Sequence, residues 1–334
     1  MNYLITGGAG FIGSHLAAYL LEQGHQVHIL DNLSTGDPEN IRKLTRYQHF
    51  RSTVADIRDV EAVEQAIARC DQVYHLAASV GVKKVMEQGV ETLTTNVLGT
   101  ENVLRLAAHY RVKVFLASSS EVYGKVQGED SLLSEADDCL IGATSKKRWG
   151  YACSKAMDEF LAKAYQEEQN LDVVIGRFFN VVGAVTSANQ KNDNGKVIPR
   201  FIDQAMKGEP IRVYGDGSQL RSFTHVTDVI QAVTALMNVP EAVGEVFNVG
   251  SENEVSIRDL AEKVKQITGS SSQIQTIPFE QIYGSGFEDI GRRSPDLTKI
   301  KSTIPYKPQF DMDQILQEAV NEYLRDKGST KAAG

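Results

Sequence analysis

Tyr151 and Lys155 form the residue pair in this sequence best suited to chemistry. They lie four apart on a predicted helix, so their side chains share one face of it. An ammonium beside a phenol stabilises the phenolate and lowers the pKa of the phenol. A tyrosine whose pKa is lowered in this way can act as a general base near neutral pH. The pattern Tyr-x-x-x-Lys is also common by chance, where it means a packed tyrosine beside a solvated lysine.

A serine-rich segment gives the tyrosine a possible partner. Ser119, Ser120 and Glu121 follow a predicted strand over residues 113–117. A hydroxyl at the end of that strand can share the proton that passes between a substrate and Tyr151. We therefore predict that a serine of this segment belongs to the catalytic group, together with Tyr151 and Lys155.

A glycine motif at the start of the chain indicates a cofactor. Gly7, Gly10 and Gly13 follow an apolar strand and open an apolar-periodic helix. This spacing permits a tight turn and lets a pyrophosphate approach the helix N-terminus, where free N–H groups and the dipole favour anions. Asp31 ends the next strand, where a carboxylate can hold an adenosine ribose diol. The 2′-phosphate of NADP would be repelled by that negative charge, so the sequence predicts NAD rather than NADP.

The elements that position these residues alternate between strand and helix. Strands are expected at residues 3–6, 26–31, 50–54, 72–78, 113–117 and 172–176, and long helices at 90–109 and 151–168. Repeated βα units predict an α/β fold with a Rossmann-type, doubly wound parallel sheet. After about residue 180 the alternation loosens. We expect an NAD-binding domain over 1–180 and a smaller C-terminal α/β lobe over 181–330 that binds substrate, with some chain returning to the first domain.

Composition excludes several classes of function. The chain has 334 residues and a net charge of −8, which argues against a nucleic-acid partner or an anionic membrane surface. No apolar run approaches the ~20 residues that span a bilayer, and residues 1–20 do not form a signal-peptide pattern. We therefore expect a cytoplasmic protein. The three cysteines are scattered and odd in number, so neither a disulfide framework nor a metal site is predicted.

With these motifs in this order, the sequence resembles the extended short-chain dehydrogenase/reductases, in the group of NAD-dependent nucleotide-sugar epimerases, dehydratases and decarboxylases. The resemblance covers nearly the whole chain. Besides the segments above, the matching pieces are residues 31–36, 56–57, 75–78, 96, 177–180, 214–226 and 292–296.

The resemblance implies a shared first step and a set of binding residues. Tyr151, with Ser119, would take the proton of the sugar 4-hydroxyl while hydride passes from C4 to NAD, leaving a 4-keto sugar. The implied cofactor-binding residues are Gly7, Gly10, Phe11, Ile12, Gly13, Asp31, Asn32, Ser34, Thr35, Gly36, Asp56, Ile57, Leu76, Ala77, Ala78, Asn96, Tyr151 and Lys155. The implied residues for the nucleoside-diphosphate sugar are Asn180, Tyr214, Arg221 and Arg292. The family also implies a homodimer formed through the helices over 90–109 and 151–168.

The segment from Ser119 to Glu121 bears on the reaction that follows the 4-keto sugar. Ser-Ser-Glu at this position resembles UDP-glucuronate decarboxylases and GDP-mannose 4,6-dehydratases, whereas dTDP-glucose 4,6-dehydratases carry Asp-Glu. The GDP-mannose enzymes usually use NADP, which Asp31 opposes. The resemblance therefore implies a UDP-glucuronate decarboxylase, with Ser120, Glu121 and Arg221 near the carboxylate and with Ser120 and Glu121 added to the catalytic residues. A 4-epimerase of a UDP-hexose or UDP-uronate, a 4,6-dehydratase and a non-catalytic NAD-binding regulatory scaffold stay open as alternatives.

Overall fold

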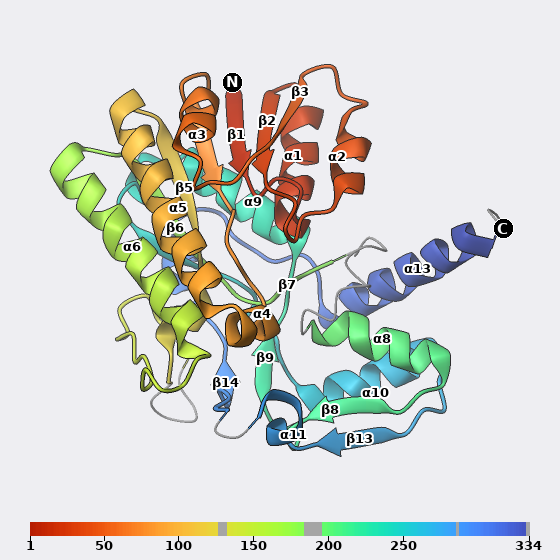
Figure 1. Ribbon diagram of the computed structural model, residues 1–334. Coiled ribbons are helices and arrows are strands. Elements are labelled where there is room, and N and C mark those ends of the chain that lie inside the picture. The colour runs from red at the N-terminus through yellow and green to blue at the C-terminus, as the bar shows by residue number, and fades with distance from the viewer. Residues whose placement is uncertain (126–131, 184–195, 285–286, 332–334) are drawn as a thin grey trace.

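The computed structural model describes residues 1–125, 132–183, 196–284 and 287–331 of the chain, with side chains described to residue 325 in the last range. A seven-stranded parallel sheet forms its larger part, with helices on both faces (Figure 1). The predicted Rossmann-type α/β fold is confirmed.

The sheet has the strand order β11-β6-β5-β4-β1-β2-β3, and each neighbouring pair is parallel. Its strands are β1 (Asn2–Thr6), β2 (Gln26–Asp31), β3 (Phe50–Val54), β4 (Gln72–His75), β5 (Lys113–Ser119), β6 (Val173–Phe178) and β11 (Val246–Val249). The chain builds outward from β1 in one direction and then from β4 in the other. Ligands of such sheets bind where the order reverses, beyond the carboxyl ends of the strands.

Helices cover the two faces of this sheet. One face carries α1 (Phe11–Glu22), α2 (Pro38–Leu44), α9 (Val226–Met237) and α12 (Thr298–Thr303), and the other carries α3 (Val60–Ile67), α5 (Gly89–Tyr110) and α6 (Trp149–Gln169). Alternate strand residues point to opposite faces. Ile5 therefore packs with the first group of helices, and its neighbour Leu4 packs with the second.

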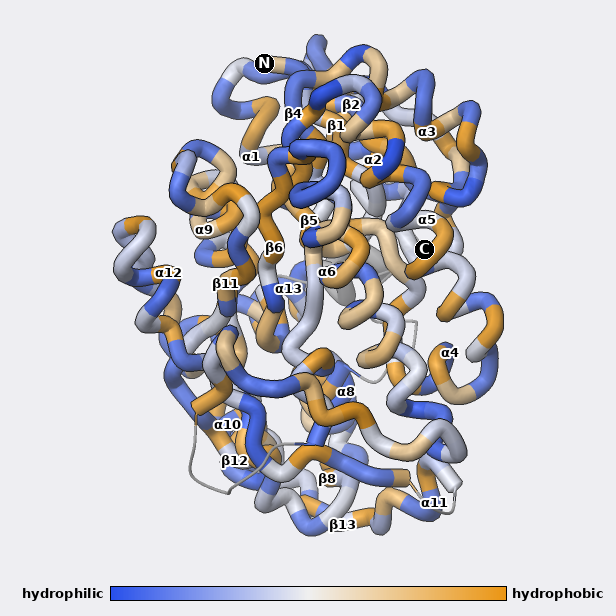
Figure 2. Tube along the Cα trace, turned by 90° about the vertical axis from the view of Figure 1, so that its left-hand side faces the viewer, coloured by the Kyte–Doolittle hydropathy of each residue, from blue (hydrophilic) through white to orange (hydrophobic). Residues whose placement is uncertain are grey.

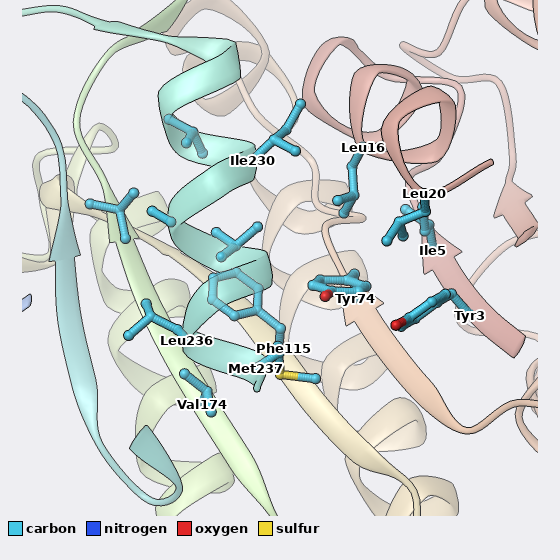
Figure 3. Packing of buried hydrophobic residues seen from close by; sticks show 14 of the residues in the cluster. Tyr3, Ile5, Leu16, Leu20, Tyr74, Phe115, Val174, Ile230, Leu236 and Met237 are labelled. Carbon is cyan, nitrogen blue, oxygen red and sulfur yellow. The ribbon is translucent and has the colours of Figure 1, made fainter. Parts of the chain in front are cut away.

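Apolar side chains account for this layering. Figure 3 shows Leu16 and Leu20 of α1 and Ile230 of α9 around the sheet residues Ile5 and Tyr74. In Figure 2 the central strands β1 and β6 run largely as hydrophobic segments, as expected for strands buried on both faces. The core thus holds the carboxyl ends of the strands in fixed positions.

A smaller lobe lies below the carboxyl edge of the sheet in Figure 1. It contains the pair β8 (Ile211–Tyr214) and β13 (Ile274–Ile277), the sheet β12-β9-β14 (Glu254–Ser256, Leu220–Ser222, Arg292–Arg293), and the helices α8 (Val197–Lys207), α10 (Ile257–Thr268), α11 (Phe279–Tyr283) and α13 (Met312–Lys331). The remaining short elements are α4 (Val82–Glu87), the 3-10 helices η1 (Ser120–Tyr123) and η2 (Pro240–Ala242), and the pair β7 (Val181–Val182) and β10 (Thr224–His225).

Chain from the second half also completes the first. The strand β11 pairs with β6, and α9 covers one face of the sheet. The division at residue 180 stays a prediction, and these two elements lie beyond it. Within the described part of the chain, no helix combines the length and the apolar character needed to cross a membrane.

Candidate active site

A cavity of about 440 Å³ lies at the carboxyl edge of the sheet, where the strand order reverses. The carboxyl ends of β1 to β6, or the residues that directly follow them, contribute to its wall, and Arg293 of β14 contributes from the smaller lobe. The predicted residues in the wall are Gly7, Gly10, Phe11, Ile12, Gly13, Asp31, Asn32, Ser34, Thr35, Ile57, Leu76, Ala77, Ala78, Ser119, Ser120, Glu121, Tyr151, Lys155 and Asn180. The predicted residues outside the wall are Gly36, Asp56, Asn96, Tyr214, Arg221 and Arg292.

The glycine motif forms a turn that has no room for side chains. Gly7 has a φ of +70°, and a Cβ there would lie 2.8 Å from the backbone nitrogen of Ala77. A Cβ on Gly13 would lie 2.4 Å from the carbonyl oxygen of Gly7. Gly10 caps α1 without a side-chain hydrogen bond, which leaves N–H groups of the first turn for a ligand. These residues fit the pyrophosphate of a dinucleotide.

Asp31 lies at the carboxyl end of β2 and also lines the cavity. Its two carboxylate oxygens accept hydrogen bonds from the backbone N–H groups of Ala9 (3.0 Å) and Leu33 (2.8 Å), which fix its orientation. Burial raises its pKa, and these two hydrogen bonds act against that rise. A Cβ on Gly36 would lie 2.7 Å from the Asp31 carboxylate, so Gly36 makes room for Asp31 and does not reach the cavity. The carboxylate suits a ribose diol, and the site therefore fits NAD.

Two predicted cofactor-binding residues lie outside the cavity wall and contact residues that line it. Asp56 accepts a hydrogen bond from the Asn32 amide at 2.8 Å and is ion-paired with Arg58, which holds the Asp56 pKa well below its usual range. Asn96 is fully buried and joins the loop after β4 to the catalytic helix, through the N–H of Ser79 (2.7 Å) and the hydroxyl of Ser154 (3.0 Å). Both residues position others that line the cavity.

Tyr151, Ser119 and Lys155 lie together at the cavity wall. The Ser119 hydroxyl bonds to the Tyr151 phenol and also accepts the N–H of Glu121 at 3.2 Å. Burial raises the Tyr151 pKa above its ordinary value, and Lys155 and Ser119 lower it only in part. Lys155 thus acts in the predicted direction, but the net pKa of Tyr151 in the chain alone lies above its ordinary value, because the loss of hydration outweighs the lysine charge.

Glu121 lies beside this group with two arginine partners. Arg148 donates to one carboxylate oxygen at 2.9 Å, and Arg293 donates to the other. Burial acts to raise the Glu121 pKa, but the two guanidinium groups outweigh it and lower the pKa to about 2. Glu121 is thus ionised at neutral pH and does not exchange a proton there.

A second carboxylate extends the cluster. Asp289 accepts from Arg221 at 3.1 Å, and its other oxygen lies 3.6 Å from Arg148. Arg293 also donates to the Asn180 amide oxygen at 3.0 Å. Burial, together with the charges of Arg293 and Arg148, lowers the pKa of Arg221 to about 10. Three guanidinium groups therefore surround two carboxylates at the substrate end of the cavity.

The structure places Arg293, and not the predicted Arg292, at the cavity. Arg292 forms a two-pronged ion pair with Glu254, at 2.6 and 2.9 Å, on the other side of β14. Neighbouring residues of a strand point in opposite directions, so the choice between them needs the strand register, which the sequence does not give. Arg148 was not among the predicted site residues, because its position just before α6 leaves open whether it faces a substrate or only sets the path of the loop.

Tyr214 lies in the smaller lobe, outside the described cavity wall. The guanidinium of Arg200 stacks on its ring at 3.8 Å, and Tyr283 meets it edge-on with ring centres 6.1 Å apart. Its role toward the nucleoside stays a prediction.

Comparison with known proteins gives a family for this arrangement. Residues 3–250 match the model of the NAD dependent epimerase/dehydratase family. A UDP-N-acetyl-alpha-D-glucosaminuronate decarboxylase of Bacillus cytotoxicus is 43% identical over 317 residues, covering 95% of this chain and 96% of that protein. UDP-glucuronic acid decarboxylase 1 of Danio rerio is 32% identical over 333 residues, covering 97% of this chain and 72% of that protein.

Solved structures agree with these matches. A variant UDP-glucuronic acid 4-epimerase of Bacillus cereus, solved with NAD and UDP-4-deoxy-4-fluoro-glucuronic acid, superimposes with a TM-score of 0.85. It is 26% identical, and the match covers 97% of this chain and 99% of that one. The expected resemblance and the expected cofactor, NAD, are confirmed.

Proposed function

Since the chain belongs to the NAD-dependent epimerase/dehydratase family and is an enzyme of that family, we propose that it decarboxylates a UDP-linked hexuronate through a 4-keto intermediate. The arginine cluster beside Tyr151 carries this proposal. A uronate has a carboxylate on C5, next to the carbon that is oxidised, and guanidinium groups bind carboxylates well. A neutral hexose offers no charge to Arg148 and Arg293 at this place.

The acetamido sugar is the substrate to try first. UDP-N-acetylglucosaminuronate is the compound in the name of the relative at 43% identity, and UDP-glucuronate is the one in the name of the relative at 32%. We propose the former as the preferred substrate and the latter as the alternative. Both carry the same carboxylate, so the arginine cluster serves either one.

The residues of the chain divide the chemistry among them. NAD, when bound, accepts hydride from C4 of the sugar and returns it at the end. The Tyr151 phenolate takes the proton of the 4-hydroxyl, and Ser119 shares that proton. The new C4 carbonyl accepts the electron pair of the C5–carboxylate bond when CO₂ leaves, and C5 is then protonated. Lys155 supplies the positive charge that favours the phenolate.

Glu121 has a positioning role in this scheme. With a pKa of about 2, it is a poor proton donor or acceptor for C5 near neutral pH. Its two oxygens hold the guanidinium groups of Arg148 and Arg293 in one place. We infer that a bound uronate shares these arginines with Glu121.

A 4-epimerase of a UDP-uronate is the second candidate. The solved UDP-glucuronic acid 4-epimerase has the same fold over nearly the whole chain. An epimerase also has to bind the carboxylate, and it then rotates the keto sugar and keeps the carboxylate. The relatives named above are enzymes, which leaves the non-catalytic scaffold without support.

Proton NMR in deuterated water separates these reactions. The enzyme is incubated with NAD and UDP-N-acetylglucosaminuronate, and in parallel with UDP-glucuronate. Loss of the carboxylate with deuterium at C5 supports decarboxylation. An intact uronate inverted at C4, without deuterium at C5, means an epimerase. An unchanged spectrum with both compounds would reject the uronates as substrates.

The helices α5 and α6 support a homodimer. They lie side by side along one edge of the molecule (Figure 1), and apolar side chains on them face solvent. Val90 and Phe160 are 79% and 71% exposed, and Leu98 and Met157 are also exposed. Burying such a surface against a second copy is favourable. Light scattering at micromolar concentration checks this, and a monomeric mass would count against it. A cytoplasmic location stays a prediction from the sequence.

A further inference from the structure

We propose that Asp158 is a positioning residue that keeps the active-site Lys155 charged and aimed at the cavity. The inference deepens the proposed function, because it rests on the use of Lys155 to favour the Tyr151 phenolate. Asp158 belongs to none of the motifs discussed above, and it does not line the cavity.

The ion pair is buried and closely spaced. Lys155 is 2% exposed and Asp158 is fully buried. The lysine ammonium donates to a carboxylate oxygen of Asp158 at 2.8 Å, between positions three apart on α6. A buried ammonium without a partner loses its proton more readily, since burial disfavours the charged form. Among the described residues, Asp158 is the carboxylate in hydrogen-bonding distance of Lys155.

Other charged groups face this pair, and their charges are already compensated. Glu159, on the same helix, forms a two-pronged ion pair with Arg177. Glu121 of η1 is paired with Arg148 and Arg293. The phenol of Tyr151 is the remaining titratable group on α6 that faces Lys155.

His75 approaches Lys155 from the sheet and is neutral. Its ring lies between the hydroxyls of Thr6 (2.7 Å) and Thr100 (3.0 Å), and Thr100 also faces Asp158. Burial and the nearby Lys155 charge lower the His75 pKa to about 3. His75 therefore adds no charge at neutral pH, and Asp158 remains the group that balances Lys155.

The charge balance decides the pH range in which the pair works. Burial acts to lower the Lys155 pKa, but Asp158, together with the smaller effects of Tyr151 and Glu159, outweighs burial, and the pKa lies above its ordinary value. Without the carboxylate, Lys155 loses its proton at a lower pH, and above that pH the Tyr151 phenolate is no longer stabilised. The alkaline side of the activity profile then moves to lower pH.

The first experiment measures Lys155 itself and needs no sugar substrate. The pH dependence of trace acetylation of Lys155, read by peptide mass spectrometry, reports its pKa in the NAD-free chain. In Asp158→Asn we expect the midpoint to fall by about one pH unit or more. Asp158→Glu, which keeps the charge, should leave it near the wild-type value. Asp158→Ser removes the charge with less bulk and takes the place of the amide variant if that one does not fold.

The second experiment measures turnover. The alkaline limb of kcat/KM against pH should move down in Asp158→Asn and stay in place in Asp158→Glu, even if kcat falls in both. Glu168→Gln, an exposed carboxylate change on the same helix, is the matched control and should leave both profiles unchanged. An unmoved acetylation midpoint in Asp158→Asn would overturn the inference. If the wild-type enzyme turns over no uronate, the proposed function fails, while the acetylation result still decides the role of Asp158.

Discussion

The two ends of the cavity are built from different parts of the chain. At the cofactor end, backbone atoms and small residues of Gly7, Gly10 and Gly13 form the wall, and Asp31 is the charged group placed there for a ribose. At the substrate end, the charged side chains of Glu121 (η1) and Arg293 (β14) form part of the wall, and Arg148, just before α6, donates a hydrogen bond to Glu121. The first end fits a shape common to all dinucleotides, and in the proposed function the second end recognises the charge of a uronate.

The difference teaches where specificity in this fold can change. A backbone wall tolerates few substitutions, because each added carbon meets another backbone atom. In a wall of side chains, single substitutions at separate places in the sequence can change which substrate is bound. Variants should therefore separate the two ends, by affecting either NAD affinity or use of the uronate.

The largest effect is expected where the two ends meet. Tyr151→Phe removes the proton acceptor, so turnover should fall by about 10³-fold while NAD affinity stays the same. Steady-state rates and calorimetric titration with NAD check this. The control is Tyr165→Phe, since Tyr165 lies on the same helix and its hydroxyl bonds Glu101 instead. Turnover that survives in Tyr151→Phe would remove the tyrosine from the chemistry.

Loss of one arginine should affect the substrate end alone. Arg148→Met removes a buried guanidinium that would hold the carboxylate, so kcat/KM for a UDP-uronate should fall by about 10²-fold. NAD affinity should not change. Arg105→Met removes a half-buried arginine that is paired with Glu101 on α5, away from the cavity wall, and should leave both quantities unchanged. A loss of NAD affinity in Arg148→Met would contradict the separation of the two ends.

A methyl group in the glycine turn should affect the cofactor end. In Gly13→Ala the new carbon would lie 2.4 Å from the Gly7 carbonyl, so the turn must shift. Overpacking of this kind costs about 1–3 kcal/mol, and we expect NAD affinity to fall by about 10- to 100-fold. Gly89→Ala is the control, because nothing lies within 4 Å of the added carbon. Unchanged NAD affinity in Gly13→Ala would show that the turn can shift to fit the methyl group without weakening the binding of NAD.

The smallest effect is expected on cofactor selectivity, from removing the charge of Asp31, which is predicted to contact the adenosine ribose. Asp31→Asn keeps acceptor capacity for the Leu33 N–H but removes the charge that opposes a 2′-phosphate. The preference for NAD over NADP should narrow by about tenfold, which corresponds to about 1.4 kcal/mol. Binding titrations with both cofactors measure it. An unchanged preference would assign the selection to another part of the wall.

The same division explains what the sequence could predict. The alternating strands gave the sheet, and the glycine motif with Asp31 gave the cofactor end, because both depend on residues close together in the chain. The sequence motif pointed to Arg292 and not to Arg293, since only strand register decides which side chain reaches the cavity. The sequence could not decide whether Arg148 faces the substrate, because its neighbours Glu121 and Asp289 are far away in sequence. Asp158 has the right spacing from Lys155, but no local pattern reveals that both are buried.

The small sheet β12-β9-β14 carries two of the arginines side by side on neighbouring strands. Arg221 and Arg293 are direct partners across the parallel pair β9 and β14, and like charges in that relation destabilise a sheet. Without a ligand, Asp289 and Glu121 offset part of this repulsion. An anion bound to these guanidinium groups adds further negative charge and relieves more of the repulsion. Folding of the lobe and capture of its substrate are thus thermodynamically linked, so that the occupied enzyme resists unfolding better than the empty one.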